Sequence, residues 1–423
     1  MSAEDVVRSR SRYPLLAVPG FGWFWFADGV SIFGTYITAQ ALRLLALLTL
    51  GASSFELGVL RAAQWLPYLL FGLVAGVLID RYRRKPVVVA ADFIRAAVLA
   101  LIPLAAAVQV LTMPLLVGLV LVFGAVSLAY DVAHQSLLPN LVPPPLLTRA
   151  NARLEQSAAV AQVGGQVGAG LLIKLLGAPA AILIDAVSYL ISGVVITRLR
   201  VAERAIPAQP PPRDMGSELR EGLRWVYRHR MLAPLSWATH AWFLCTSMVA
   251  TIYVVFVVSD LGFDAAIYGL TLAVGGVGAV VGSSIAVGLG TRLGIGKAII
   301  LGRWLAVVGY ASIPLAHSGA GGALVLCAGQ FVFWLSVGID SPLEMAYGQS
   351  VTPDRLMGRM RATIRSMNRA ALVIGAPLGG ALALWCGQRP TLWIVVAGIA
   401  AAALGLTGSQ FRHARLEESS SNR

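Results

Sequence analysis

The chain has 423 residues, of which 57% are apolar and 13% are charged, and its formal net charge is +13. Soluble domains carry about 25% charged residues, so this composition excludes a water-soluble globular protein and predicts a polytopic membrane protein. The basic excess does not indicate a nucleic-acid partner. The cations lie in short segments between apolar runs and form no patch on a soluble fold.

Twelve apolar runs are long enough to cross a bilayer, because a membrane helix needs about 17–25 such residues. They lie near residues 21–48, 57–79, 86–108, 113–137, 155–176, 179–198, 233–259, 265–289, 297–316, 320–347, 361–385 and 390–409. The sequence therefore predicts an all-α membrane protein with twelve transmembrane helices. The longest polar interval contains SELREGLRWVYRHR, which is typical of an amphipathic helix on the membrane surface.

The distribution of Lys and Arg predicts the orientation. Twenty-five of the 33 basic residues lie on the side that holds the N-terminus, and three lie at the opposite ends of the spans. Because cytoplasmic loops retain the positive charge, we expect both termini in the cytoplasm and the protein in the cell inner membrane.

An internal repeat predicts two similar halves. LVPPPLLTRANA (141–152) resembles SVTPDRLMGRMRA (350–362), and a shift of 209 residues places Val142 on Val351 and Pro144 on Pro353. We therefore expect an N-terminal six-helix bundle (1–198), a cytoplasmic linker with the amphipathic helix (199–232) and a C-terminal six-helix bundle (233–423).

The segment between the second and third spans resembles the loop signature of the major facilitator superfamily, G-x-x-x-D-R-x-G-R-K. Here it reads GVLIDRYRRK, with Arg83 in place of the second glycine; the matching residues are Gly76, Asp80, Arg81, Arg84 and Lys85. The stretches FADGVSIFG (26–34), ALLTLGASSFELGVL (46–60) and LIDAVSYLIS (183–192) resemble the drug- and siderophore-exporter branch of that family, of the macrolide-efflux and enterobactin-exporter type.

The resemblance implies two pseudo-symmetric bundles that alternate access to a central site. It also implies that Asp80 docks against the start of the eleventh span when the cytoplasmic side closes. The GGQVGAG run (164–170) resembles the exporter motif G-P-x-x-G-G, with Gly165 and Ala169 as departures.

Ionisable residues inside spans are candidates for proton binding, because burying a charge in a membrane is costly. The candidates are Asp28, Asp131, Asp340 and Glu344. We favour Asp28, since Ser31, Thr35 and Thr38 share its face and would line a polar cavity; a structural hydrogen bond is the alternative. Asp131, with His134 one turn away, and the Asp340–Glu344 pair could instead form an inner gate with Arg365 and Arg369.

A second polar stripe lies on the seventh span, where aromatic residues adjoin it. We expect these side chains to contact an amphipathic substrate or to anchor the helix at the interface. The remaining cavity candidates are Arg43, His240, Trp242, Phe243, Ser247 and Thr251. Small residues that let helices approach closely are expected at Gly164, Gly168, Gly375 and Gly379.

No nucleotide-binding, zinc-protease or serine-hydrolase motif occurs in the sequence. We therefore expect no enzyme activity, no cofactor and no metal. The sequence predicts a monomeric secondary transporter that exports a small amphipathic molecule (a drug, secondary metabolite or siderophore) in exchange for protons. An uptake facilitator, a lipid flippase and a non-transporting receptor are the alternatives.

Overall fold

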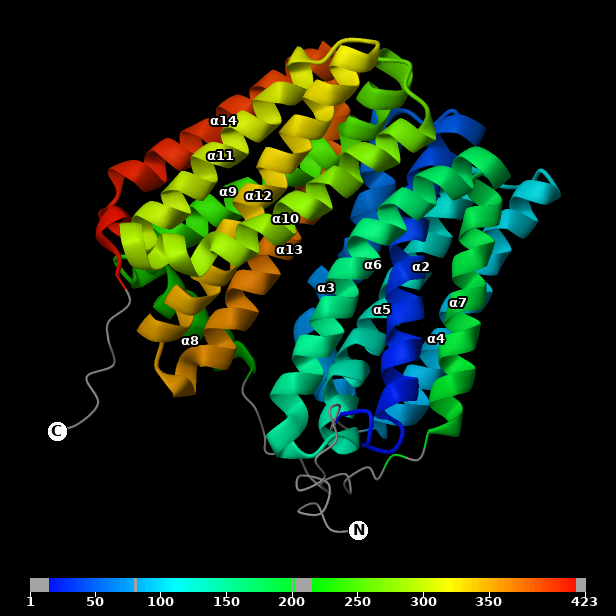
Figure 1. Cartoon of the computed structure of the whole chain (residues 1–423), viewed down its shortest axis with the longest axis horizontal. Coiled ribbons are helices and arrows are strands. Elements are labelled where there is room, and N and C mark those ends of the chain that lie inside the picture. The colour runs from blue at the N-terminus through cyan, green and yellow to red at the C-terminus, as the bar shows by residue number, and fades with distance from the viewer. Residues whose placement is uncertain (1–14, 80–81, 200, 202–214, 416–423) are drawn as a thin grey trace. The chain divides into compact units, whose positions relative to one another are not determined.

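The computed structural model describes residues 15–79, 82–199, 201 and 215–415, and every regular element in these ranges is helical. The chain divides into two compact units. The first consists of residues 1–50 and 66–210, and the second of residues 51–65 and 211–423. Figure 1 shows that long helices run roughly side by side within each unit.

The first unit contains five complete helices and the second half of a sixth. They are α2 (Phe21–Thr49), α3 (Ser54–Ile79), α4 (Arg84–Ala107), α5 (Met113–Leu141), α6 (Leu147–Leu176) and α7 (Ala178–Arg198). Helix α7 packs against α2 and α4, α4 also packs against α5, and α2 packs against α6. A short 3₁₀ turn, Pro144–Leu146, joins α5 to α6.

The second unit contains the start of α3 and seven further helices. They are α8 (Met215–Arg228), α9 (Leu232–Val255), α10 (Ala265–Leu293), α11 (Ile295–Leu315), α12 (Ala320–Val351), α13 (Asp354–Cys386) and α14 (Gln388–Gly408). Helix α12 packs between α10 and α11, while α9 contacts α13 and α14. A π-helical turn (Phe256–Asp260) extends α9, and a 3₁₀ turn (Gln410–His413) follows α14.

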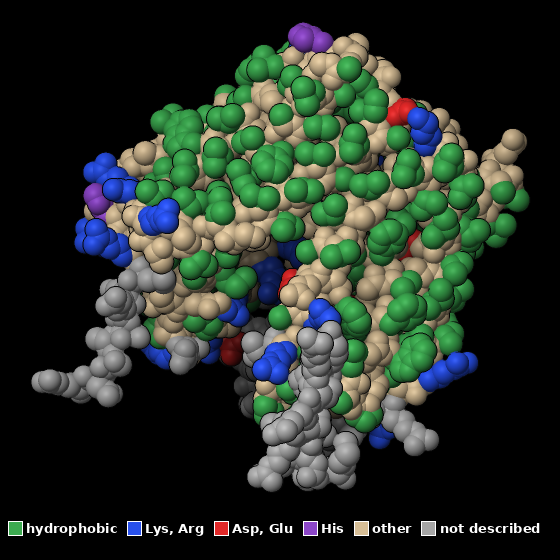
Figure 2. All heavy atoms as spheres, viewed as in Figure 1, with side chains coloured by type: hydrophobic (Ala, Val, Ile, Leu, Met, Phe, Trp, Pro, Cys, Tyr) green, Lys and Arg blue, Asp and Glu red, His purple; other side chains and the backbone are tan. Residues whose placement is uncertain are grey.

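Eleven of the described helices are long and apolar enough to cross a membrane, which confirms a polytopic all-α protein. The twelfth expected span, 57–79, falls on α3, which has 26 residues. Apolar side chains are spread widely over the face shown in Figure 2; Trp385 and Leu175 are among the exposed apolar residues, at 89% and 76%. Soluble proteins rarely expose so many large apolar side chains together. Such a surface is expected to face lipid.

The two units share the same backbone geometry at equivalent positions. Helices α7 and α14 both have 21 residues, and each follows a glycine of similar conformation: Gly177 (φ 83°, ψ 162°) and Gly387 (φ 88°, ψ 165°). Pro143 (φ −57°, ψ 144°) likewise matches Pro353 (φ −58°, ψ 144°) before α6 and α13. The offset is therefore 210 residues at these points. The shift of 209 residues inferred from the sequence was one residue too short here. Residue identity paired Pro144 with Pro353, whereas the backbone angles pair Pro143 with Pro353.

The start of α3 is fixed by a reciprocal cap. The Ser53 hydroxyl accepts a hydrogen bond from the Glu56 backbone N–H (3.2 Å), and the Glu56 carboxylate accepts from the Ser53 backbone N–H and hydroxyl (2.8 Å each). Such a capping box satisfies amide groups that a helix start would leave unpaired. This half of α3 packs within the second unit, where a Cβ atom added to Gly58 would lie 2.4 Å from the Ala376 carbonyl oxygen. It thereby brings Arg61 and Trp65 to the site described next.

Candidate functional site

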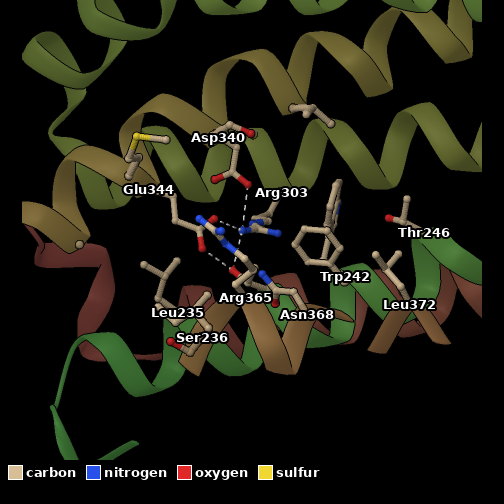
Figure 3. Close-up of a pocket in the computed structure, with 18 of the residues that line it drawn as sticks. Leu235, Ser236, Trp242, Thr246, Arg303, Asp340, Glu344, Arg365, Asn368 and Leu372 are labelled. Carbon is tan, nitrogen blue, oxygen red and sulfur yellow. Dashed lines mark hydrogen bonds and ion pairs between the residues drawn. The ribbon is translucent and has the colours of Figure 1, made fainter. Parts of the chain in front are cut away.

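The second unit encloses a cavity of about 680 Å³. Its walls come from α9, α11, α12 and α13, with two side chains from the start of α3. Figure 3 shows charged side chains meeting at one end and Trp242, Thr246 and Leu372 lying farther along. The volume lies within the range of small-molecule sites, about 300–1,000 Å³.

Arg303 of α11 is the centre of the charged cluster in this cavity. Its Nη2 atom lies 2.9 Å from Asp340 Oδ2 and 3.0 Å from Glu344 Oε2. The same nitrogen donates to the Thr239 hydroxyl at 2.9 Å, and that hydroxyl donates to Glu344 Oε1 at 2.9 Å. One guanidinium nitrogen therefore connects α11 to α9 and to α12.

The guanidinium is deeply buried, and only part of it is paired. The Arg303 side chain is 4% exposed. Within the described part of the chain, its Nε and Nη1 atoms have no hydrogen-bond partner, and neither does Asp340 Oδ1. Buried polar groups are nearly always satisfied, and a buried cation is costly in a membrane. A cluster with unused donors and acceptors at a cavity wall is typical of a functional site.

Aromatic rings form much of the remaining wall. Trp242 lies 5.7 Å from the Arg303 guanidinium carbon, measured to the ring centroid, and it stacks on Phe333 at 6.0 Å. Arg369 lies 4.2 Å above the ring of Trp65. Phe243 and Trp334 also line the cavity. Aromatic faces beside a few charged groups suit a ligand that has an apolar body and a polar end.

A hydrogen-bonded chain connects the cavity to the linker helix α8. Asn368 lines the cavity, and its Oδ1 atom lies 2.7 Å from His240 Nδ1. The other ring nitrogen, Nε2, lies 2.7 Å from the Tyr227 hydroxyl of α8. His240 thus lies behind the wall and positions a residue of the wall.

The structure brings most of the second unit's predicted residues to this cavity. Those that line it are Trp242, Phe243, Asp340, Glu344, Arg365 and Arg369. The sequence grouped the two carboxylates with Arg365 and Arg369, whereas the ion pairs in the structure are to Arg303. Ser247 and Thr251 are buried within α9, where they donate to the backbone oxygens of Leu372 and Ser247.

The two predicted acids of the first unit have different partners. Asp28 Oδ1 lies 3.2 Å from His134 Nε2, and the imidazole stacks between Phe24 and Tyr130 at 4.8 and 5.1 Å. Asp131 does not pair with its neighbour His134 but accepts from the Tyr68 hydroxyl at 2.6 Å.

The other polar residues of α2 are satisfied locally or buried. The Thr35 hydroxyl donates to the Ser31 carbonyl (2.9 Å) and lies 2.8 Å from the Tyr189 hydroxyl. Ser31 and Thr38 are buried. Arg43 donates from Nε to the Ala39 carbonyl at 2.8 Å.

Sequence reasoning missed two buried arginines as site residues. Besides Arg303, Arg95 of α4 pairs with Asp92, which also accepts from the Ser192 hydroxyl at 2.8 Å. The Arg95 guanidinium carbon lies 3.6 Å from the ring centroid of Tyr130. An arginine within an apolar span was the available signal in both cases. The partners of Arg303 lie on other helices, so the sequence alone could not identify them.

Part of the loop motif lies outside the described residues, namely Asp80 and Arg81. Gly76 lies in α3 and Arg84 begins α4. Lys85 Nζ donates to the carbonyls of Thr197 and Leu199, at 2.9 and 2.8 Å. A cation is favoured at the C-terminal end of a helix, so Lys85 fixes the end of α7.

The predicted packing glycines lie at helix contacts. A Cβ atom added to Gly164 or Gly168 would lie 3.3 Å from the ring of Phe33. At Gly375 and Gly379 it would lie 2.4 and 2.6 Å from backbone atoms of α9.

Comparison with known proteins identifies the family. The family model described as "Major Facilitator Superfamily" matches residues 24–376 of this chain. The multidrug efflux pump Tap of Mycobacterium tuberculosis is 29% identical over 219 residues, which cover 50% of this chain and 51% of Tap. Macrolide efflux protein A of Streptococcus pyogenes is 25% identical over 216 residues, which cover 51% of this chain and 53% of that protein. The chain thus spans about half the length of these two relatives.

Solved structures share the fold at low sequence identity. The nucleoside transporter NupG superposes with a TM-score of 0.76 at 11% identity, covering 92% of this chain and 98% of NupG. A bacterial homologue of the iron transporter ferroportin gives 0.72 at 17% identity, covering 94% and 99%. With eleven described helices long and apolar enough to cross a membrane and a family match across most of its length, the chain belongs to the Major Facilitator Superfamily.

Proposed function

We propose that the protein exports a small amphipathic molecule, such as a drug, secondary metabolite or siderophore, across the cell inner membrane by alternating access. The observation that carries this proposal is the cavity of about 680 Å³, where aromatic walls meet the Arg303–Asp340–Glu344 cluster. Two relatives that match half of the chain are named as efflux pumps for multiple drugs and for macrolides, which supports export over uptake.

A proton gradient drives this export in our proposal. The Asp340 and Glu344 carboxylates lie one turn apart and share one nitrogen of Arg303, and Asp340 Oδ1 has no hydrogen-bond partner among the described residues, so this pair is the first candidate to carry the proton. Asp28 is the second candidate, since its carboxylate lies within a span of the first unit, 3.2 Å from the imidazole of His134 on another helix. Asp131, which accepts from Tyr68, is the third.

Purified protein in liposomes tests direction and coupling together. Export of a fluorescent amphipathic dye should accelerate when a pH gradient is imposed and collapse when an ionophore removes it. Asp340→Asn and Asp28→Asn separate the two principal candidates, because only the variant at the coupling site should abolish the response to the gradient. Transport at full rate in both variants and without a gradient would favour a facilitator or flippase. Ligand binding without transport would favour a receptor.

The loop between α3 and α4 is proposed to act as a gate. By resemblance to the family, Asp80 would dock at the start of α13, where a carboxylate is favoured near a helix N-terminus. Asp80→Asn is expected to slow dye transport several-fold without changing which dyes are transported. A changed substrate range at an unchanged rate would contradict the gate.

A further inference from the structure

The wall of the second unit's cavity carries more positive than negative charge. Its acidic lining residues are Asp340 and Glu344, and both are bound to Arg303. Its cationic lining residues are Arg61, Arg303, Arg361, Arg365 and Arg369. Among the described residues neither carboxylate pairs with Arg361 or Arg365, so the wall carries cations beyond the one that its two carboxylates bind.

Membrane topology does not explain this excess. The positive-inside rule concerns cations in the loops beside the spans, whereas Arg303 and Arg369 lie well within α11 and α13. Arg303 is 4% exposed, and two of its three guanidinium nitrogens have no partner among the described residues. Cations buried in a span are retained for a function, because each one is costly to insert.

Two accessible cations line the same cavity as the aromatic rings. Arg361 and Arg365 are one turn apart on α13, and both side chains are exposed. Figure 3 shows Arg365 directed toward the Arg303–Glu344 cluster, with Trp242 farther along the cavity. A planar guanidinium binds carboxylate or sulfonate oxygens through two parallel N–H groups. The apolar part of the same ligand would then lie against the indole rings.

We propose that the cavity binds an amphipathic organic anion, held by Arg365 at its charged end and by Trp242 and Trp334 along its apolar body. This rests on the proposed export function and names its substrate class. A negative charge on the substrate means that the membrane potential contributes to its export. In a cell that is negative inside, a potential of 100 mV favours exit of a monovalent anion by about fifty-fold, so the membrane potential and the proton gradient act in the same direction.

Three naphthalene probes of similar shape test the charge preference. They are naphthalene-2-sulfonate (anionic), naphthalene-2-sulfonamide (neutral) and 2-naphthylmethylammonium (cationic). Equilibrium dialysis against the detergent-solubilised full chain should give an affinity for the sulfonate about tenfold or more above those for the other two. Equal or tighter binding of the neutral or cationic probe, or no binding of any probe, would overturn the proposal.

Substitutions in α13 test whether an arginine of the cavity wall determines the preference for the anionic probe. Arg365→Gln should weaken sulfonate binding about three- to tenfold and leave the neutral probe unchanged, while Arg365→Lys should restore most of the loss. Arg355→Gln is the matched control, because it removes the same charge from an exposed position of the same helix outside the cavity lining. Equal losses in Arg355→Gln and Arg365→Gln would overturn the proposal.

Transport of the same probes in liposomes separates this inference from the proposed function. Selective binding of the sulfonate without any transport would leave the charge preference intact and contradict export. Transport of the cationic probe in preference to the sulfonate would leave export intact and overturn the anionic substrate.

Discussion

Arg303 shows how one side chain can organise a site within a membrane. Its Nη2 atom binds Asp340, Glu344 and Thr239, which lie on two other helices, within 3.0 Å. Removing the partner of a buried charge is costly, because the charge then loses the interactions that offset its burial. The buried carboxylates and the buried guanidinium therefore stabilise one another.

Removal of the cation should destabilise the protein. Arg303→Met removes the ion-pair partner that two carboxylates one turn apart share, and breaking a buried ion pair in this way costs about 3–5 kcal/mol. We expect a clearly lower midpoint of thermal unfolding in detergent, followed by tryptophan fluorescence. The triple variant Arg303→Met, Asp340→Asn, Glu344→Gln should recover most of the midpoint, since no buried charge is then left alone. An unchanged midpoint in Arg303→Met would show that the pairs contribute nothing to stability.

At the scale of elements, glycines set how closely helices approach. Gly282 of α10 faces Gly338 of α12. A Cβ atom added to Gly282 would lie 2.2 Å from the Leu335 carbonyl oxygen, and one added to Gly338 would lie 2.3 Å from the Ala279 carbonyl oxygen. Both neighbours are backbone atoms, which cannot move aside as a side chain can.

A single methyl group at this contact should therefore force α10 and α12 apart. Gly282→Ala is expected to lower stability by about 1–3 kcal/mol, the usual cost of overpacking, with a lower midpoint of thermal unfolding. Gly288→Ala on the same helix is the control, because an added Cβ there meets no atom within 4 Å. It should be neutral or slightly stabilising through better helix propensity. Equal effects at both positions would contradict the packing argument.

Helix α8 illustrates how an amphipathic segment is partnered. The sequence indicated a membrane-surface helix, and in the structure α8 packs against α13. Arg359 pairs with Glu221 and lies 3.5 Å from Glu218, while the Trp225 indole donates to the Thr352 hydroxyl at 3.3 Å. The polar face of α8 is therefore partly used in contacts with protein.

Loss of the Arg359 pairs should loosen α8. In Arg359→Ala, trypsin is expected to cleave within α8, at Arg220 or Arg224, several-fold faster than in the unmodified protein, as measured by gel electrophoresis of timed digests. Arg355→Ala provides a control on the first turn of the same helix, because Arg355 is exposed and pairs with neither glutamate of α8. Identical digestion of both variants would show that the ion pairs do not hold α8.

At the scale of the whole molecule, the distribution of basic residues predicts cytoplasmic termini. Cys386 lies at the end of α13 and is exposed, whereas Cys245 is buried. A membrane-impermeant maleimide should therefore label Cys386 in intact cells. In a variant without native cysteines, Ser217→Cys on α8 should be labelled only after permeabilisation. The reverse pattern would invert the topology.

The fold was largely predictable because a bilayer imposes simple rules. Apolar runs of a fixed length become helices, while the asymmetric distribution of basic residues predicts their orientation. The repeat was visible for the same reason, although its register near Pro143 required the backbone angles. Individual candidates such as Trp242 and Asp340 could be found because polar and aromatic residues are conspicuous in an apolar span.

The sequence by itself determined the class of protein, the type of its elements and the approximate positions of its apolar helices, and it supplied candidate site residues. These follow from local composition and the length of apolar runs. Only the tertiary structure decided which charges meet. Arg303 pairs with carboxylates about 40 residues away on α12, and Asp28 pairs with His134 from a different helix. Such contacts depend on how helices rotate and pack against one another, and that information is not contained in the periodicity of any single span.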